Sequence, residues 1–273
     1  MSENEINTQQ DMTLPVIPLR GMAILPDTII HFDLNREASI RALEFAMVRG
    51  GTLFLTVQKD PDVEKPKPEQ LCRIGTTAQV KQITKLPGQV VRVLVESRYR
   101  GKLLEINEEN TKFLEARVQV IPEEEELSEE EQVLQEAMLR QVKELFAQFA
   151  VHYPKLDKNA MQRYANMKSL GRLLDQIAMN LPTDYEKKQQ ALETIEVKKR
   201  YELLCVHLQR EIEIAVAREE LAQKIKGRVE KNQKEYLLRE QLRYIKEELG
   251  DEGSFSDADQ FEEALSKLQA SVA

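Results

Sequence analysis

The sequence has few of the residues that build disulfide frameworks, base-stacking surfaces or membrane spans. Its two cysteines, Cys72 and Cys205, lie far apart, whereas a disulfide framework needs more of them. Tryptophan is absent and aromatic residues make up 5% of the chain, so no large platform for stacking bases is available. No run approaches the roughly 18 apolar residues of a membrane span, and residues 1–12 lack the apolar core of a signal peptide. We therefore expect a soluble, cytoplasmic protein in a reducing compartment.

The charge balance argues against nucleic acid as the main partner. The 273 residues include 39 Lys and Arg against 47 Asp and Glu, which gives a net charge of −8. No segment carries the strong positive excess that neutralises phosphates. The charged fraction of 32% is high for a compact globule and is typical of a long, solvent-exposed helix.

Motifs that would indicate catalysis are also missing from the sequence. It contains no G-x-x-x-x-G-K-[ST], no G-x-G-x-x-G and no H-E-x-x-H. The three histidines, His31, His152 and His207, fall in three separate predicted elements, so we do not expect them to share a metal ion. Cys72 follows a loop without a nearby base, and burial is the expected role. We predict no catalytic residue, no metal site and no bound cofactor within this chain, which should bind and not catalyse.

The first part of the sequence, 13–122, predicts a small β domain after a disordered lead-in at 1–12. Helical spacing over 36–49 ends at Gly50-Gly51, because glycine accepts the left-handed conformation of a helix end. Runs of apolar, β-branched residues predict strands at 14–20, 28–34, 52–57, 75–83, 90–96, 101–106 and 112–121. A strongly curved or closed sheet is expected, since closure hides the hydrogen-bonding groups of strand edges.

The rest of the sequence predicts helices. Pro122 and the acidic run 123–126 mark a boundary, and Ser128 with Glu131 forms a capping box. We expect an acidic linker and helical subdomain at 123–185, a long helix at 186–249, and a hinge with the start of another helix at 250–273. Within these regions, continuous helices are predicted up to Tyr153, over 159–180 and over 185–249. The predicted class is thus α+β. The last helical pattern reaches Ala273 without a cap, so we expect the natural protein to continue.

The long helix carries a short apolar seam near its end. Leu238, Leu242, Ile245 and Leu249 recur at spacings of 4, 3 and 4, as in a coiled coil, and we assign Tyr236 to the same assembly surface. Two heptads are too few to hold an isolated helix in water. The seam therefore predicts a partner helix, either from another chain or from the continuation of this chain. The alternative is that the seam packs within the chain's own core.

Five segments, in order, resemble the amino-terminal region of the bacterial Lon family of ATP-dependent proteases. The most specific is 231–242, continuing to Gly250, which is similar to the segment that leads into the family's ATPase domain. Two departures stand out: Ser97 and Asp27 lie where the family often has glycine. The other four segments are 14–20 with Leu25-Pro26, 35–44, 74–76 and 86–96.

The resemblance implies a PUA-like β domain, a helical domain and a long helix that joins a hexameric ATPase ring. It implies that the whole protein, with ATP and Mg²⁺, degrades misfolded, damaged and short-lived regulatory proteins. The ATP-binding Walker motifs and the Ser–Lys protease dyad of the family would lie beyond Ala273. The expected partners are unfolded substrates and the other subunits of a homo-hexamer, with no membrane and no nucleic acid.

A receptor for unfolded chains needs an adaptable apolar surface. The candidates are two turns with apolar side chains: Met22, Ile24 and Leu25 in the first, and Leu86-Pro87 in the second. The alternative is that these side chains plug the end of the barrel or pack on the helical domain. Two other functions stay open at this point, namely an RNA-binding PUA-like module and a chaperone-like holdase that acts alone.

Overall fold

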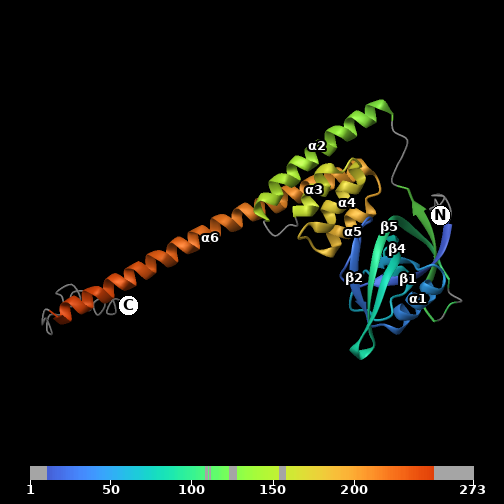
Figure 1. The fold of residues 1–273 in the computed structure, drawn as a ribbon, viewed down its shortest axis with the longest axis horizontal. Coiled ribbons are helices and arrows are strands. Elements are labelled where there is room, and N and C mark those ends of the chain that lie inside the picture. Colours follow the sequence, from blue (N-terminus) through green and yellow to red (C-terminus); the bar gives the residue numbers. More distant parts are fainter. Residues whose placement is uncertain (1–10, 108–109, 111, 123–127, 154–157, 249–273) are drawn as a thin grey trace, which may run out of the picture. The chain divides into compact units, whose positions relative to one another are not determined.

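The computed structural model describes residues 11–107, 110, 112–122, 128–153 and 158–248. The chain divides into two units, Met1–Glu213 and Ile214–Ala273, and each is described by itself. The first unit contains a β-sheet and a group of helices, and the second contains the end of a long helix (Figure 1). None of the described helices is both long and apolar enough to cross a membrane.

Six strands form one mixed sheet, in which β1 and β3 are parallel and the other pairs are antiparallel. The strand order is β2-β5-β4-β3-β1-β6, and an additional pairing of β5 with β6 closes five of the strands into a ring. Strand β5 makes this closure possible because its first part pairs with β2 and its second part with β6. Strand β2 stays outside the ring. The strands are β1 (Asp11–Leu19), β2 (Ile29–Leu34), β3 (Thr52–Val57), β4 (Ile74–Leu86), β5 (Val90–Ile106) and β6 (Glu115–Ile121).

The prediction of two strands over 90–106 is wrong, because β5 runs through Gly101 without a break. The absence of a side chain at Gly101 allows Phe54 and Val118 to pack close to the backbone of β5. A Cβ atom at Gly101 would lie 2.8 Å from Cγ1 of Val118 and 2.9 Å from Cε2 of Phe54. Strand β1 also begins earlier than expected, at Asp11, which pairs with Gln119 of β6.

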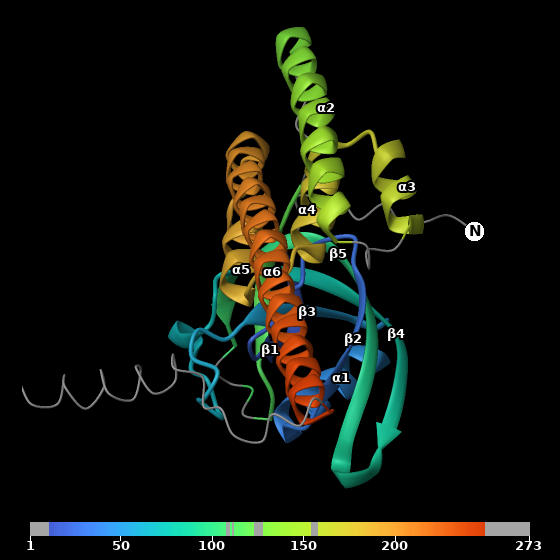
Figure 2. The same cartoon turned by 90° about the vertical axis from the view of Figure 1, so that its left-hand side faces the viewer.

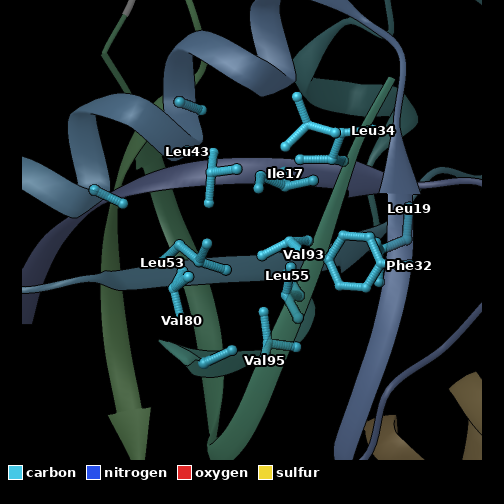
Figure 3. Packing of buried hydrophobic residues seen from close by; sticks show 14 of the residues in the cluster. Ile17, Leu19, Phe32, Leu34, Leu43, Leu53, Leu55, Val80, Val93 and Val95 are labelled. Carbon is cyan, nitrogen blue, oxygen red and sulfur yellow. The ribbon is translucent and has the colours of Figure 1, made fainter. Parts of the chain in front are cut away.

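The sheet and helix α1 (Glu37–Val48) enclose the first core. Leu43 of α1 points down onto Ile17, Leu53 and Val93 of the sheet, and all four side chains are buried (Figure 3). A separate cluster on the other side of β3 centres on Phe54. Burying these side chains is what fixes the sheet around α1, since each contributes about 1.5–3 kcal/mol.

The helices that follow are α2 (Glu129–His152), α3 (Lys158–Asn166), α4 (Leu170–Asn180), α5 (Tyr185–Glu193) and α6 (Val197–Glu248). Short 3₁₀ turns lie at Pro68–Gln70 and Pro87–Gln89. The capping box of α2 is confirmed: Ser128 N–H donates to Oε2 of Glu131 at 2.9 Å, and Glu131 N–H donates to Oγ of Ser128 at 3.4 Å.

Two of the predicted helices are each divided in two. The helix expected over 159–180 stops at Asn166 and restarts at Leu170, where the hydroxyl of Ser169 accepts from Arg172 N–H. The stretch expected to be continuous from 185 stops at Glu193 and restarts at Val197. Neither break contains proline or glycine, so composition gave no sign of them. The second break leaves backbone carbonyls free to accept hydrogen bonds from buried arginines.

Candidate functional site

The first candidate turn lies between the sheet and the helices, and most of it is buried. Ile24 is 2% exposed and belongs to the core under α1, whereas Leu25 is fully buried among the helices. The predicted exposure of both residues is therefore wrong, and the alternative, packing against the sheet core and the helical domain, describes them. Only Met22 of this group is partly exposed, and it packs against the sheet core.

Side-chain hydroxyls hold the backbone of this turn in place. The hydroxyl of Thr76 donates to the carbonyl of Ile24, and the hydroxyl of Ser97 donates to the carbonyl of Leu25, both at 2.6 Å. Ser97 Oγ also accepts from Thr28 N–H at 2.9 Å. Asp27 has φ of 55°, a conformation that favours glycine. Of the two departures from the family pattern, Asp27 thus lies in this turn, and Ser97, on β5, holds the turn through its hydroxyl.

The second candidate turn is the tip of the β4–β5 hairpin. Leu86 is partly buried and Pro87 is exposed, while Gly88 and Gln89 have positive φ and reverse the chain. The hairpin projects away from helices α2–α5 (Figures 1 and 2), among which Leu25 is packed. The structure therefore does not join the two turns into one apolar surface, and Leu86-Pro87 forms an exposed apolar tip by itself.

The predicted seam lies on the second unit. Leu238, Leu242 and Ile245 are 50%, 57% and 52% exposed, so no described part of the chain covers them. Leu249 lies outside the described residues. Tyr236 cannot belong to the same face, because at about 100° per residue it lies roughly 160° around the helix from Leu238. The apolar stripe is thus narrower than predicted and, within the described residues, consists of Leu238, Leu242 and Ile245.

A buried ionic cluster that the sequence analysis missed ties the sheet to the helices. The guanidinium of Arg100, on β5, donates two hydrogen bonds to the carboxylate of Asp175 on α4, at 2.6 and 2.5 Å. Arg200, near the start of α6, donates to the same carboxylate at 2.9 Å. None of the three side chains is more than 4% exposed. A signal was present, because Asp175 interrupts the apolar face that runs through α4.

The break between α5 and α6 completes this cluster. Nε of Arg100 donates to the carbonyl of Leu192 at 3.1 Å, and Arg200 donates to the carbonyl of Ile195 at 3.0 Å. These carbonyls are available because they lie where α5 ends and α6 has not begun. The amide of Gln189 adds a further link by donating to the carbonyl of Ile74 at 3.0 Å. The cluster therefore connects the sheet to the helices through buried polar interactions, and it is not an open binding site.

A shallow cavity of about 460 Å³ lies between α3, α4 and the turn at Asp27. Three cationic residues, Arg163, Lys168 and Arg172, line it together with the aromatic ring of Tyr164. Arg172 is paired with Asp27 at 3.4 Å. Burial raises the pKa of the Asp27 carboxyl, and Arg172 opposes that shift. The excess of cations favours an anionic over a cationic occupant.

The two thiols and the histidines do not assemble into a reactive centre. Burial raises the pKa of Cys72 to about 11 and also raises the pKa of Cys205, so both thiols stay protonated near neutral pH. His31 is exposed on β2, and His207 is half-buried on α6. In the part of the chain that the structure describes, no three His, Cys, Asp or Glu side chains lie close enough together to hold a metal ion.

The sequence matches a known protein family over most of its length. Residues 13–210 fit the family described as the ATP-dependent protease La (LON) substrate-binding domain. The match begins in β1 and ends in α6, and so it includes the sheet, the ionic cluster and helices α1–α5. It stops before the exposed stripe of α6.

Curated proteins named Lon protease are similar to nearly the whole chain. The protein from Lachnoclostridium phytofermentans is 40% identical over 258 residues, which cover 94% of this chain and 32% of that protein. The protein from Clostridioides difficile strain 630 is 38% identical over 264 residues, which cover 96% of this chain and 34% of that protein. The chain therefore spans about a third of the length of these relatives.

One solved structure, the N terminal domain of Mycobacterium avium complex Lon protease, has a similar fold. The TM-score is 0.59 at 18% sequence identity, covering 72% of this chain and 98% of that chain. At this identity the likeness concerns the fold. It confirms the predicted α+β class, a mixed sheet with one helix followed by helices of which the last is long.

Proposed function

This chain belongs to the Lon family through its substrate-binding domain, and we propose that it captures unfolded or damaged proteins for an ATP-dependent protease. The observation that carries the proposal is the family match over 13–210, which coincides with the sheet and the helices joined to it. The resemblance read from the sequence is thereby confirmed. The proposal has three further parts: the substrate is unfolded, it is degraded, and other parts of the protein use ATP and Mg²⁺.

The exposed apolar hairpin tip supports capture of unfolded chains. Leu86 and Pro87 lie at the end of a hairpin that projects from the ring of strands, away from helices α2–α5 of the same unit, where a long polypeptide can reach them. Unfolded proteins expose apolar segments that folded proteins bury, so an apolar tip distinguishes the two. Met22 contributes only through the part of its side chain that the sheet core leaves accessible.

The stripe of Leu238, Leu242 and Ile245 supports assembly with further copies of the chain. Half or more of each of these residues is exposed, at a spacing that fits a facing helix. Charged residues flank the stripe, as in Arg243, which pairs with Glu247 at 3.4 Å. A second helix packed on this stripe would bury the three apolar side chains and leave the ion pairs at its rim.

The capture proposal is tested by fluorescence anisotropy with a labelled, reduced and carboxymethylated polypeptide. We expect the protein to bind this unfolded chain and not the same polypeptide in its native, disulfide-bonded state. Leu86→Asp should weaken binding about tenfold, because it removes an apolar contact and adds a charge. Lys85→Asp, one residue away and exposed, makes a charge change twice as large without removing an apolar side chain, and it serves as the control for charge.

Two results would refute the proposal. Equal affinity for the native and the unfolded polypeptide would show that the chain does not select unfolded protein. An equal loss of affinity for the unfolded polypeptide in Leu86→Asp and Lys85→Asp would show that charge, and not apolar contact, controls binding at the tip. The melting temperature of each variant shows whether the sheet is intact.

A further inference from the structure

Strand β2 is the one described strand that lies outside the closed ring, and along its whole length one edge has no paired strand. The ring runs β5-β4-β3-β1-β6 and returns to β5, whereas β2 pairs with β5 alone among the described strands. In Figure 1, β2 lies at the outer side of the sheet. A strand at an edge presents unpaired N–H and C=O groups to which another strand can bind.

The pairing pattern shows which backbone groups point outward. Ser97 N–H donates to the carbonyl of Thr28 at 2.9 Å, so the pair Thr28–Ser97 is a hydrogen-bonded pair. In an antiparallel ladder, hydrogen-bonded and non-hydrogen-bonded pairs alternate. No register shift interrupts the β2–β5 pairing, in which Ile29 lies opposite Glu96. The N–H and C=O groups of Ile29, His31 and Asp33 therefore point away from β5, toward the open edge.

This edge lacks the features that usually prevent strand addition. Proteins protect edges with lysine, proline, bulges or unpaired inward charges. Strand β2 has no lysine and no proline, and its one charged residue, Asp33, is neutralised by two hydrogen bonds from Arg92 at 2.7 and 2.9 Å. The register shifts of the sheet fall between β4 and β5 and between β5 and β6. The Ile29 side chain is 66% exposed beside this edge.

We propose that the open edge of β2 binds an extended segment of an unfolded polypeptide as an additional strand. The inference rests on the proposed function and names what is recognised, namely backbone amides together with an apolar side chain that packs on Ile29. Unfolded proteins differ in side chains but share the same backbone, so an edge that pairs with backbone accepts many sequences. A segment of about six residues matches the length of β2.

The first test compares His31→Pro with His31→Ala in the full chain. Proline at this position removes an outward N–H group and leaves the β2–β5 hydrogen bonds in place, whereas alanine removes only the side chain. We expect His31→Pro to weaken binding of the unfolded polypeptide several-fold, up to about tenfold for one lost hydrogen bond. His31→Ala should bind like the unmodified protein.

The second test leaves the protein unchanged and varies an apolar eight-residue peptide. Two versions carry three N-methyl groups each, one at alternating and one at consecutive residues. Alternating methyl groups leave one edge of the peptide able to pair, while consecutive ones interrupt both edges. We expect the alternating peptide to bind nearly as well as the unmethylated one and the consecutive peptide to bind about tenfold more weakly or worse.

The outcomes separate this inference from the proposed function. Equal affinity of the two methylated peptides would overturn pairing at the edge, even if unfolded protein still binds. Failure of the unmodified protein to bind any unfolded polypeptide would overturn both. If His31→Pro dissolves a dimer but leaves polypeptide affinity unchanged, the edge pairs with a second copy of the chain, and the inference is wrong.

Discussion

The first unit of the molecule contains a buried ionic cluster, whereas the ion pairs described in the second unit are accessible to solvent. In the first unit, Arg100, Asp175 and Arg200 are removed from solvent and form hydrogen bonds that join the sheet to the helices. In the second unit, described up to Glu248, the ion pairs are exposed and local, such as Lys226–Glu230 at 3.9 Å. Exposed pairs of this kind contribute little, whereas breaking a buried pair is costly. The first unit is thus stabilised by its own interior, whereas the described residues of the second unit form no such interior.

The largest expected effect is therefore at Asp175. Asp175→Asn would remove the buried carboxylate that the guanidinium groups of Arg100 and Arg200 share, and we expect a loss of about 3–5 kcal/mol in the free energy of unfolding. Asp33→Asn is the matched control, because Asp33 also accepts two hydrogen bonds from an arginine but is 42% exposed. It should cost far less than Asp175→Asn, because exposed ion pairs are screened by solvent and contribute little. Urea denaturation followed by circular dichroism measures both, and equal losses would remove the contrast between buried and exposed ion pairs.

The second prediction concerns association through α6. If Leu238, Leu242 and Ile245 face a second helix, Leu242→Asp should raise the dissociation constant by at least about thirtyfold, since it forfeits roughly 2 kcal/mol of apolar burial. Tyr236→Asp introduces the same charge on the opposite side of the helix and should leave the constant nearly unchanged. Sedimentation equilibrium distinguishes the two variants. Similar masses for both would mean that the stripe does not mediate self-association.

The third prediction applies one substitution in both units. Gly101→Ala forces a Cβ atom to within 3 Å of Phe54 and Val118, and we expect a loss of about 1–3 kcal/mol. Gly227→Ala lies inside α6 with no other atom within 4 Å of the new Cβ, and it should stabilise the helix by about 0.5–1 kcal/mol. Thermal unfolding measures the first effect and helix content at 222 nm the second. If both substitutions stabilised the protein, or both destabilised it, the distinction between the packed sheet and the solvent-exposed helix would be contradicted.

The sequence was sufficient to predict those features that depend on local pattern. Alternating and β-branched residues located the strands, and the pair Ser128 and Glu131 located the start of α2. The break at 194–196 could not be predicted in this way, because its cause is not wholly local. The carbonyls of Leu192 and Ile195 accept from arginines that lie far away in the sequence or across a turn. Helical periodicity on both sides of such a break looks continuous.

The candidate site was less predictable than the fold for a related reason. Apolar residues at a turn bounded by Gly21 and Pro26 look exposed in the sequence, but Leu25 reaches the helical core, whose members are up to about 180 residues away. The open edge of β2 depends on which strands close the ring. Pairing between strands that lie far apart in the sequence cannot be recognised from local composition. By contrast, Leu86 and Pro87 were placed correctly at a turn because hairpin tips are local structures.

The smallest expected effect is the pH dependence that His207 adds to the first unit. Desolvation by burial lowers the pKa of His207, and nearby Lys187 lowers it further against the opposing effect of Asp184 and Glu211. The folded protein therefore binds a proton less readily than the unfolded chain, whose histidine titrates near 6.5. The contribution to stability is present above that pH and is lost as pH falls through the lower pKa of the folded state. His207→Gln should make the decline in unfolding free energy between pH 7.5 and pH 5 less steep. If the variant declines as steeply as the unmodified protein, groups other than His207 cause the pH dependence.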